Sequence, residues 1–128
     1  MSAAVQAVPG RTLWAIPEGY IPGASTGQGR ALESHEAVCI LNAGPHEAHL
    51  ELTLYFADRD PAGPYRVTVA PRRTLHLRFN DLRDPEPVPR DTDYASVLVS
   101  DQPVVLQHTR LDSRQSALAL LSTIAYGE

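Results

Sequence analysis

The chain has 128 residues, of which 43% are hydrophobic and 20% are charged, and its formal net charge is −4. This length and hydrophobic content are typical of one globular domain with a proper core, and they exclude an intrinsically disordered chain. The acidic balance argues against a dedicated nucleic-acid-binding domain, and no apolar run reaches the roughly 18 residues that a membrane-spanning helix needs.

Alternation of apolar and polar residues predicts β-strands along most of the chain. In the clearest run, residues 48–56, every second residue is apolar, as expected for a strand with one buried face. Turn signals rich in glycine and proline separate the runs. Only residues 113–121 suggest one or two helical turns. In chain order, strands are predicted at residues 12–16, 36–41, 48–56, 65–69, 74–79, 94–100, 104–109 and 121–126.

These strands predict an all-β fold, a single-domain antiparallel β-sandwich of about eight strands with jelly-roll-like crossings. We expect one domain over residues 1–128, with residues 1–10 as a flexible N-terminal extension. The N-terminal residues lack the pattern of a signal peptide, and the single cysteine, Cys39, suits a buried position in a reducing compartment. We therefore expect a cytoplasmic protein without membrane insertion.

Polar and charged residues continue directly after the apolar run 103–106, where a turn would be expected. His108, Arg110, Asp112 and Arg114 belong to this segment, and charges at a strand end cost free energy unless they meet partners. We predict that Arg110, Asp112 and Arg114 pair with one another or across a subunit boundary. The segment is then an interface or the wall of a ligand pocket.

Catalytic and metal-binding patterns are weak. His46 and His49 are three residues apart, a spacing that aligns ligands on a helix and not on a strand. His108, Asp112 and Ser113 have the residue types of a catalytic triad, but neighbours on a strand point to opposite faces. We predict no metal site, no catalytic residues, no cofactor and no enzymatic activity.

Two further groups are candidates for binding. Aromatic rings that stack on sugars, with carboxylates and imidazoles that bond to hydroxyl groups, suit a hydroxylated ligand. That group comprises Trp14, Glu18, Tyr20, His35 and Glu36, although Trp14 is equally consistent with the core. A second group, Arg66, His76 and Arg78, is expected on the solvent side of adjacent strands, where it could contact nucleic-acid phosphates. An ordinary solvated strand face is the simpler interpretation of that second group.

Six segments closely resemble the Anabaena sensory rhodopsin transducer family, and together they extend from Arg11 to Tyr126. They are RTLWAIPEGYIP (11–22), SHEAVCILNAG (34–44), GPYRVTV (63–69), RFNDL (78–82), QHTRLDSRQ (107–115) and LSTIAY (121–126). The resemblance implies a small cytoplasmic β-sandwich that assembles as a homotetramer. For the founding member it implies a soluble partner of a membrane photoreceptor, with DNA binding also proposed. For other members it implies sensing of small ligands such as sugar derivatives.

Three hypotheses of function follow. The first is a non-enzymatic signalling adaptor or sensor that binds a partner protein, such as a membrane photoreceptor, or a small ligand. The second is a carbohydrate-binding module, with Trp14, Tyr20 and residues 108–114 lining pockets at a subunit boundary. The third is a transcriptional regulator that binds DNA weakly through its arginine face. Since the family has no established catalytic set, the resemblance assigns no catalytic residue to this chain.

Overall fold

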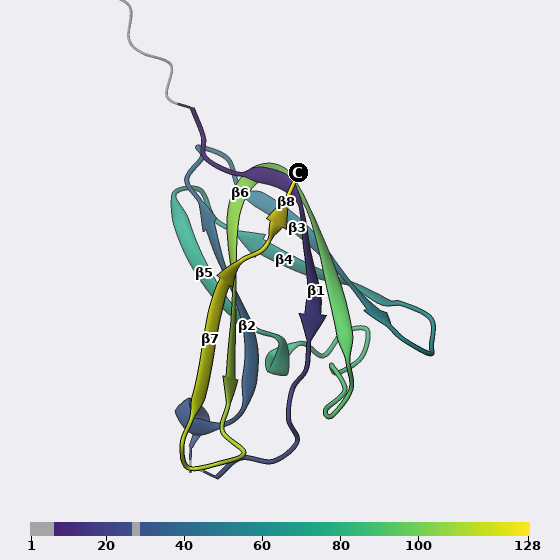
Figure 1. The fold of residues 1–128 in the computed structure, drawn as a ribbon. Coiled ribbons are helices and arrows are strands. Elements are labelled where there is room, and N and C mark those ends of the chain that lie inside the picture. The colour runs from purple at the N-terminus through teal and green to yellow at the C-terminus, as the bar shows by residue number, and fades with distance from the viewer. Residues whose placement is uncertain (1–6, 27–28) are drawn as a thin grey trace, which may run out of the picture.

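The computed structural model describes residues 7–26 and 29–128, and Figure 1 shows their arrangement. The predicted N-terminal extension, residues 1–10, falls outside the described residues over positions 1–6. Strands dominate, and the two helices are short 3-10 turns. In chain order the elements are β1 (Arg11–Gly19), η1 (Arg30–Leu32), β2 (His35–Asn42), β3 (Ala48–Phe56), β4 (Ala62–Val69), β5 (Arg73–Arg78), η2 (Phe79–Asp81), β6 (Tyr94–Asp112), β7 (Ala119–Ile124) and β8 (Tyr126–Gly127).

The strands form two antiparallel sheets that share β6. Sheet A has the order β4-β3-β6-β1-β8, and sheet B has the order β5-β2-β6-β7. The first part of β6 pairs with β1 and β3, whereas its last part pairs with β2 and β7. The predicted fold class, an all-β antiparallel sandwich with jelly-roll-like crossings and eight strands, is confirmed.

The core lies between the sheets and follows the predicted alternation. Along β3, Leu50, Leu52 and Leu54 are buried, while Glu51 between them is exposed. Each fully buried leucine side chain contributes about 1.5–3 kcal/mol relative to an exposed one. Val38 and Ile40 of β2 and Leu106 of β6 bury their side chains from sheet B, so both sheets contribute to one core.

The prediction of two separate strands at residues 94–100 and 104–109 was wrong, because β6 is one strand of 19 residues. Its pairing with β3 ends at Ser100, and its pairing with β2 begins at Val105. Pro103 lies between these two ladders. A proline there removes no hydrogen bond to β2 or β3, so the strand continues while it passes from sheet A to sheet B.

The prediction of helical turns at residues 113–121 was also wrong. Asp112 of β6 is in register with Ala119 of β7, and the ladder continues to Gln107 and Ile124. Residues 114–117 form bends without a helix. Pairing with β6 gives one side of the β7 backbone a continuous ladder of six residue pairs, whereas an isolated helical turn is costly to nucleate. The chain then returns to sheet A, where β8 pairs with β1.

Candidate functional site

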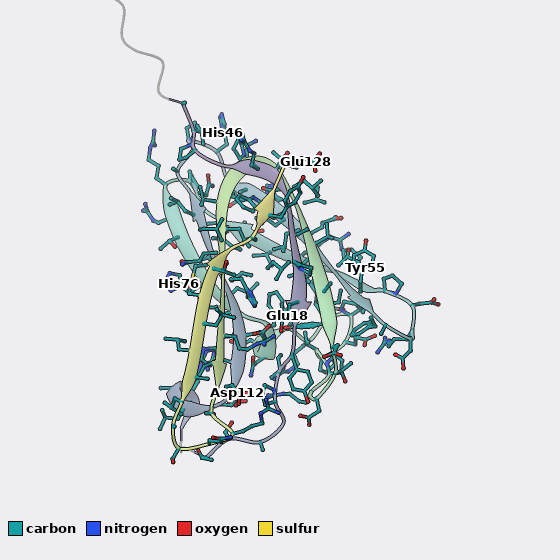
Figure 2. The ribbon with its side chains drawn as sticks, in the orientation of Figure 1. Glu18, His46, Tyr55, His76, Asp112 and Glu128 are labelled. Atoms are coloured by element: carbon teal, nitrogen blue, oxygen red, sulfur yellow. The ribbon has the colours of Figure 1, made fainter. Side chains whose placement is uncertain are left out.

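A cleft opens at the side of the sandwich where β1 of sheet A and β7 of sheet B lie near each other. Its volume is about 360 Å³, within the range of roughly 300–1,000 Å³ that is typical of small-molecule sites. Figure 2 shows Glu18 midway along the molecule, between β1 and the β6–β7 pair. The lining residues are Ala15, Ile16, Pro17, Glu18, His108, Leu121, Thr123, Ile124, Ala125 and Tyr126.

A buried carboxylate, Glu36, lies next to His108, one of the lining residues. Its side chain has no exposed surface. Arg110 Nε donates to Oε2 at 2.9 Å, and His108 Nε2 donates to Oε1 at 3.1 Å. The backbone N–H of Tyr20 also donates to Oε1, at 3.2 Å. These donors compensate for the loss of water around the buried charge.

The register between β2 and β6 creates this group. Glu36 is opposite Arg110, and Val38 is opposite His108. Residues at i and i+2 of a strand share one face, so His108 and Arg110 both point between the sheets toward Glu36. The two ends of the ion pair are 74 residues apart in the chain. We refer to Glu18, Glu36, His108 and Arg110 as the Glu36 network.

Arg110 joins the buried part of the network to the cleft. Its Nη1 donates to Glu18 Oε1 at 3.0 Å, and the Glu18 side chain is 71% exposed. Burial alone would lower the pKa of Arg110. Its interactions with Glu36 and Glu18 have a larger opposite effect, so the pKa of Arg110 is raised. Arg110 therefore stays charged and holds both carboxylates.

Tyr94 is a member of this region that sequence reasoning missed. Its ring contacts Phe79, with centroids 5.7 Å apart, and a Cβ at Gly19 would collide with it. Among the described residues, its buried hydroxyl has no hydrogen-bond partner. Burial and then the nearby Glu36 carboxylate raise the pKa of Tyr94 far above its ordinary value. In the sequence, a tyrosine at the start of a predicted strand does not indicate that its hydroxyl will be buried near Glu36.

Trp14 and His35 lie apart from the network. Trp14 is buried, and its Nε1 donates to the carbonyl of Val104 at 3.0 Å and to that of Arg11 at 3.1 Å. Its ring is therefore in the core and does not line the cleft. His35 is half-buried, and its Nδ1 donates to the carbonyl of Glu33 at 2.8 Å.

Asp112 and Arg114 form a separate pair at the end of β6. Arg114 Nη2 donates to Asp112 Oδ2 at 2.6 Å, and this hydrogen bond holds the pKa of Asp112 below its usual range. The Arg114 guanidinium also lies 5.7 Å from the ring centroid of Tyr20, whose hydroxyl donates to Asp91. The predicted pairing within the 107–114 segment thus holds for Asp112 and Arg114, whereas Arg110 pairs with Glu36 and Glu18.

The expectation that Arg66, His76 and Arg78 lie on adjacent strands was wrong. Arg66 belongs to β4 in sheet A, whereas His76 and Arg78 belong to β5, which pairs only with β2 in sheet B. Arg66 Nη2 is 3.7 Å from Glu51 Oε1. Arg78 Nη1 donates to the carbonyl of Arg30 at 2.8 Å. These three residues therefore do not form one basic face.

Metal-binding geometry is absent from residues 7–26 and 29–128, where no group of three or more His, Cys, Asp or Glu side chains could hold a metal ion. His49 instead bonds to two carboxylates, Asp101 Oδ2 at 2.8 Å and Glu47 Oε1 at 2.9 Å. Within the same described part of the chain, no helix is long and apolar enough to cross a membrane.

Comparisons of the sequence and of the structure with known proteins point to the same family. The family described as "Anabaena sensory rhodopsin transducer" matches residues 9–127. A solved Anabaena sensory rhodopsin transducer is 58% identical, with a TM-score of 0.74, and covers 81% of this chain and 100% of its own. The crystal structure of Thermotoga maritima 1070 is 36% identical, with a TM-score of 0.81, and covers 93% of this chain and 96% of its own.

No curated protein matches the chain. The family match extends over both sheets, the cleft and all four residues of the Glu36 network. The two solved structures share this fold over most of the chain. The chain belongs to the Anabaena sensory rhodopsin transducer family.

Proposed function

We propose that this chain is a non-enzymatic signalling adaptor or sensor, which acts by binding a small ligand in the β1–β7 cleft and a partner protein elsewhere. The observation that carries the proposal is the position of the Glu36 network. The buried Glu36–Arg110 pair is connected to the apolar cleft through two lining residues, His108, which bonds to Glu36, and the exposed Glu18, which bonds to Arg110. Clefts with apolar walls and a few oriented polar groups are typical of ligand sites.

The network also supports the signalling part of the proposal. Glu36 accepts a hydrogen bond from the backbone N–H of Tyr20, and the Tyr20 side chain contacts Asp91 and Arg114 at the end of the molecule. A ligand at Glu18 therefore acts on a continuous set of contacts that leads away from the cleft. Contiguous polar contacts of this kind are one physical route for coupling between sites.

We also propose a homotetramer, and the outer surface of sheet A is the best candidate for a subunit contact. Leu13 is opposite Val99, and Ala15 is opposite Tyr126, so these four uncharged side chains share that surface beside Glu51, which is also opposite Val99. Val99 is 52% exposed and Tyr126 is 63% exposed. Contiguous exposed apolar surface of this kind marks protein contacts. Val99→Asp should lower the assembly mass measured by light scattering, whereas Thr74→Asp on β5 of sheet B, also at an exposed position, should not.

The two alternative functions gain no comparable support. The carbohydrate-binding hypothesis relied on Trp14 as a stacking platform, and that ring is buried with its N–H bonded to backbone carbonyls. The DNA-binding hypothesis relied on one arginine face, and Arg66 lies in a different sheet from Arg78. Both observations favour the adaptor and sensor hypothesis.

A thermal-shift screen with small molecules tests the proposal, because a ligand that binds the native state raises its melting temperature. Thr123 lines the cleft, and Thr123→Trp should remove the effect of each active compound by filling that space. Thr68→Trp is the matched control, since Thr68 is exposed on another edge strand. The proposal is wrong if no compound raises the melting temperature, or if active compounds remain equally active on Thr123→Trp.

A further inference from the structure

We propose that the β1–β7 cleft is specific for a small organic cation with an apolar body, and that the cationic head group binds Glu18. This inference rests on the proposed function, because it names the chemical class of ligand for the same cleft. Three observations support the inference: the charge of the residues that line the cleft, the hydrogen bonds that Arg110 already makes, and the apolar residues of the cleft walls.

The carboxylate of Glu18 sets the charge of the cleft lining. Glu18 is the one carboxylate among the lining residues, and no arginine is among them. His108 also lines the cleft, but its Nε2 is bonded to Glu36 Oε1. The second carboxylate, Glu36, shares the guanidinium of Arg110 with Glu18. A cation at this position would be attracted to Glu18, whereas an anion would be repelled.

Arg110 is committed to carboxylates and is not among the residues that line the cleft. Three of its five N–H groups are in use, because its Nε donates to Glu36 Oε2 at 2.9 Å, its Nη1 to Glu18 Oε1 at 3.0 Å, and its Nη2 to Glu36 Oε1 at 3.5 Å. A carboxylate or phosphate that drew the guanidinium toward the cleft would compete with Glu18 and Glu36 for it. Displacing Glu36 would leave a buried charge without its partner, which is strongly unfavourable.

Glu18, in contrast, is accessible. Its side chain is 71% exposed and lines the cleft, and Arg110 bonds only to Oε1. The second oxygen, Oε2, accepts no hydrogen bond from any residue that the structure describes. An ammonium group that donates to this oxygen would make a charge-assisted hydrogen bond, which is stronger than a neutral one.

The residues of the cleft walls indicate that the rest of the ligand is apolar. Ile16, Leu121, Ile124 and Ala125 present apolar surface to the cleft, and Leu121 and Ile124 are exposed. Covering them with an apolar body is favourable because it removes this surface from water. Tyr126 at the rim adds an aromatic ring, which attracts cations, and its hydroxyl donates to the Glu128 carboxylate at 3.0 Å.

Isothermal titration calorimetry with three matched probes tests the inference. The probes are 2-phenylethylamine, 2-phenylethanol and 3-phenylpropanoate, which share an aromatic body and differ in the charge of the head group. We expect the amine to bind at least about tenfold more tightly than the alcohol, which corresponds to about 1.4 kcal/mol. The carboxylate should bind more weakly than the alcohol.

Two variants assign the preference to Glu18. In Glu18→Gln, the amine and the alcohol should bind with nearly equal affinity. Glu51→Gln is the matched control, because Glu51 is also an exposed strand carboxylate beside an arginine, and it should keep the preference. Equal binding of amine and alcohol to the unaltered protein, tighter binding of the carboxylate, or an unchanged preference in Glu18→Gln would each overturn the inference.

The outcomes separate the inference from the proposed function. If the alcohol binds, if Thr123→Trp abolishes that binding, and if the amine has no advantage, the cleft is a ligand site and only the cationic class is wrong. If none of the three probes binds at millimolar concentration while other compounds in the screen do, the cationic class is again wrong. If no probe and no screened compound binds, the proposed function fails as well.

Discussion

Arg110 Nε donates a hydrogen bond of 2.9 Å to Oε2 of Glu36, a carboxylate with no exposed surface. The pair joins the last part of β6 to the start of β2, next to the lining residues Glu18 and His108. Breaking such a pair is expensive, because the partner that remains keeps its charge in a place without water. The pair therefore combines a structural role with a role in shaping the cleft.

Replacement of Arg110 with alanine tests the structural role. Arg110→Ala should lower the free energy of unfolding by about 3–5 kcal/mol, the range for a buried pair that loses one partner. Denaturation in urea, followed by the fluorescence of the single tryptophan, Trp14, measures this change. Arg66→Ala is the control, because Arg66 and Glu51 form an exposed pair 3.7 Å apart; it should change stability by less than about 0.5 kcal/mol. Similar effects of the two substitutions would contradict the account.

The hydroxyl of Tyr94 has no partner among the described residues, so its removal should not destabilise the fold. Tyr94→Phe should leave the free energy of unfolding unchanged or raise it by about 1 kcal/mol, because a buried hydroxyl without a hydrogen bond is costly. Tyr65→Phe is the matched control, since the Tyr65 hydroxyl donates to the carbonyl of Glu86 at 2.7 Å. That control should lose about 0.5–1.5 kcal/mol. If Tyr94→Phe lost more than Tyr65→Phe, the Tyr94 hydroxyl would have a partner of its own.

His49 gives the stability of the chain a pH dependence with a defined sign. Hydrogen bonds first to Asp101 and then to Glu47 raise the pKa of His49 above its ordinary value of 6.5. A raised pKa in the folded state contributes stability that is complete below the unfolded pKa and is lost as the pH rises through the folded pKa. The melting temperature should therefore decline as the pH rises above about 6.5.

A variant isolates the contribution of His49 from that of the other histidines. His49→Gln cannot take up the proton, so its melting temperature should decline less steeply across the same pH range. Differential scanning calorimetry between pH 6 and pH 9 compares the two proteins. A difference in melting temperature that grows with rising pH, instead of shrinking, would contradict the assigned sign.

Local alternation was sufficient to predict β1, β3 and β4 of sheet A. The β3 strand, Ala48–Phe56, matches the predicted run of residues 48–56 because one face of this strand is buried and the other is exposed. The continuity of β6 was not predictable in this way. Asp101 and Pro103 are residues typical of turns. A strand can include them because β6 stops pairing with β3 at Ser100 and starts pairing with β2 at Val105.

The candidate site was predicted in its composition but not in its pairing. Glu18, Glu36, His108 and Arg110 were all among the candidate residues. His108 and Arg110 were candidates because charges beside an apolar run need partners, and Glu18 and Glu36 because carboxylates near aromatic rings suit a hydroxylated ligand. The pairing of Arg110 with Glu36 depends on the register between β2 and β6, which brings together residues 74 positions apart. The local sequence instead favoured Asp112 as the partner of Arg110. Nothing in the local sequence marked Tyr94 as part of the site, since its burial depends on contacts with Gly19 and Phe79.

The most direct test of ligand binding at the cleft is a titration with 2-phenylethylamine followed residue by residue in amide NMR spectra. The account predicts that the largest shift changes occur at Glu18, Leu121, Thr123 and Ile124, which line the cleft, and that Thr68 and His76 do not change. Saturable changes confined to those lining residues would support the account. Changes centred on the outer strands β4 or β5, or no saturable change at millimolar probe, would contradict it.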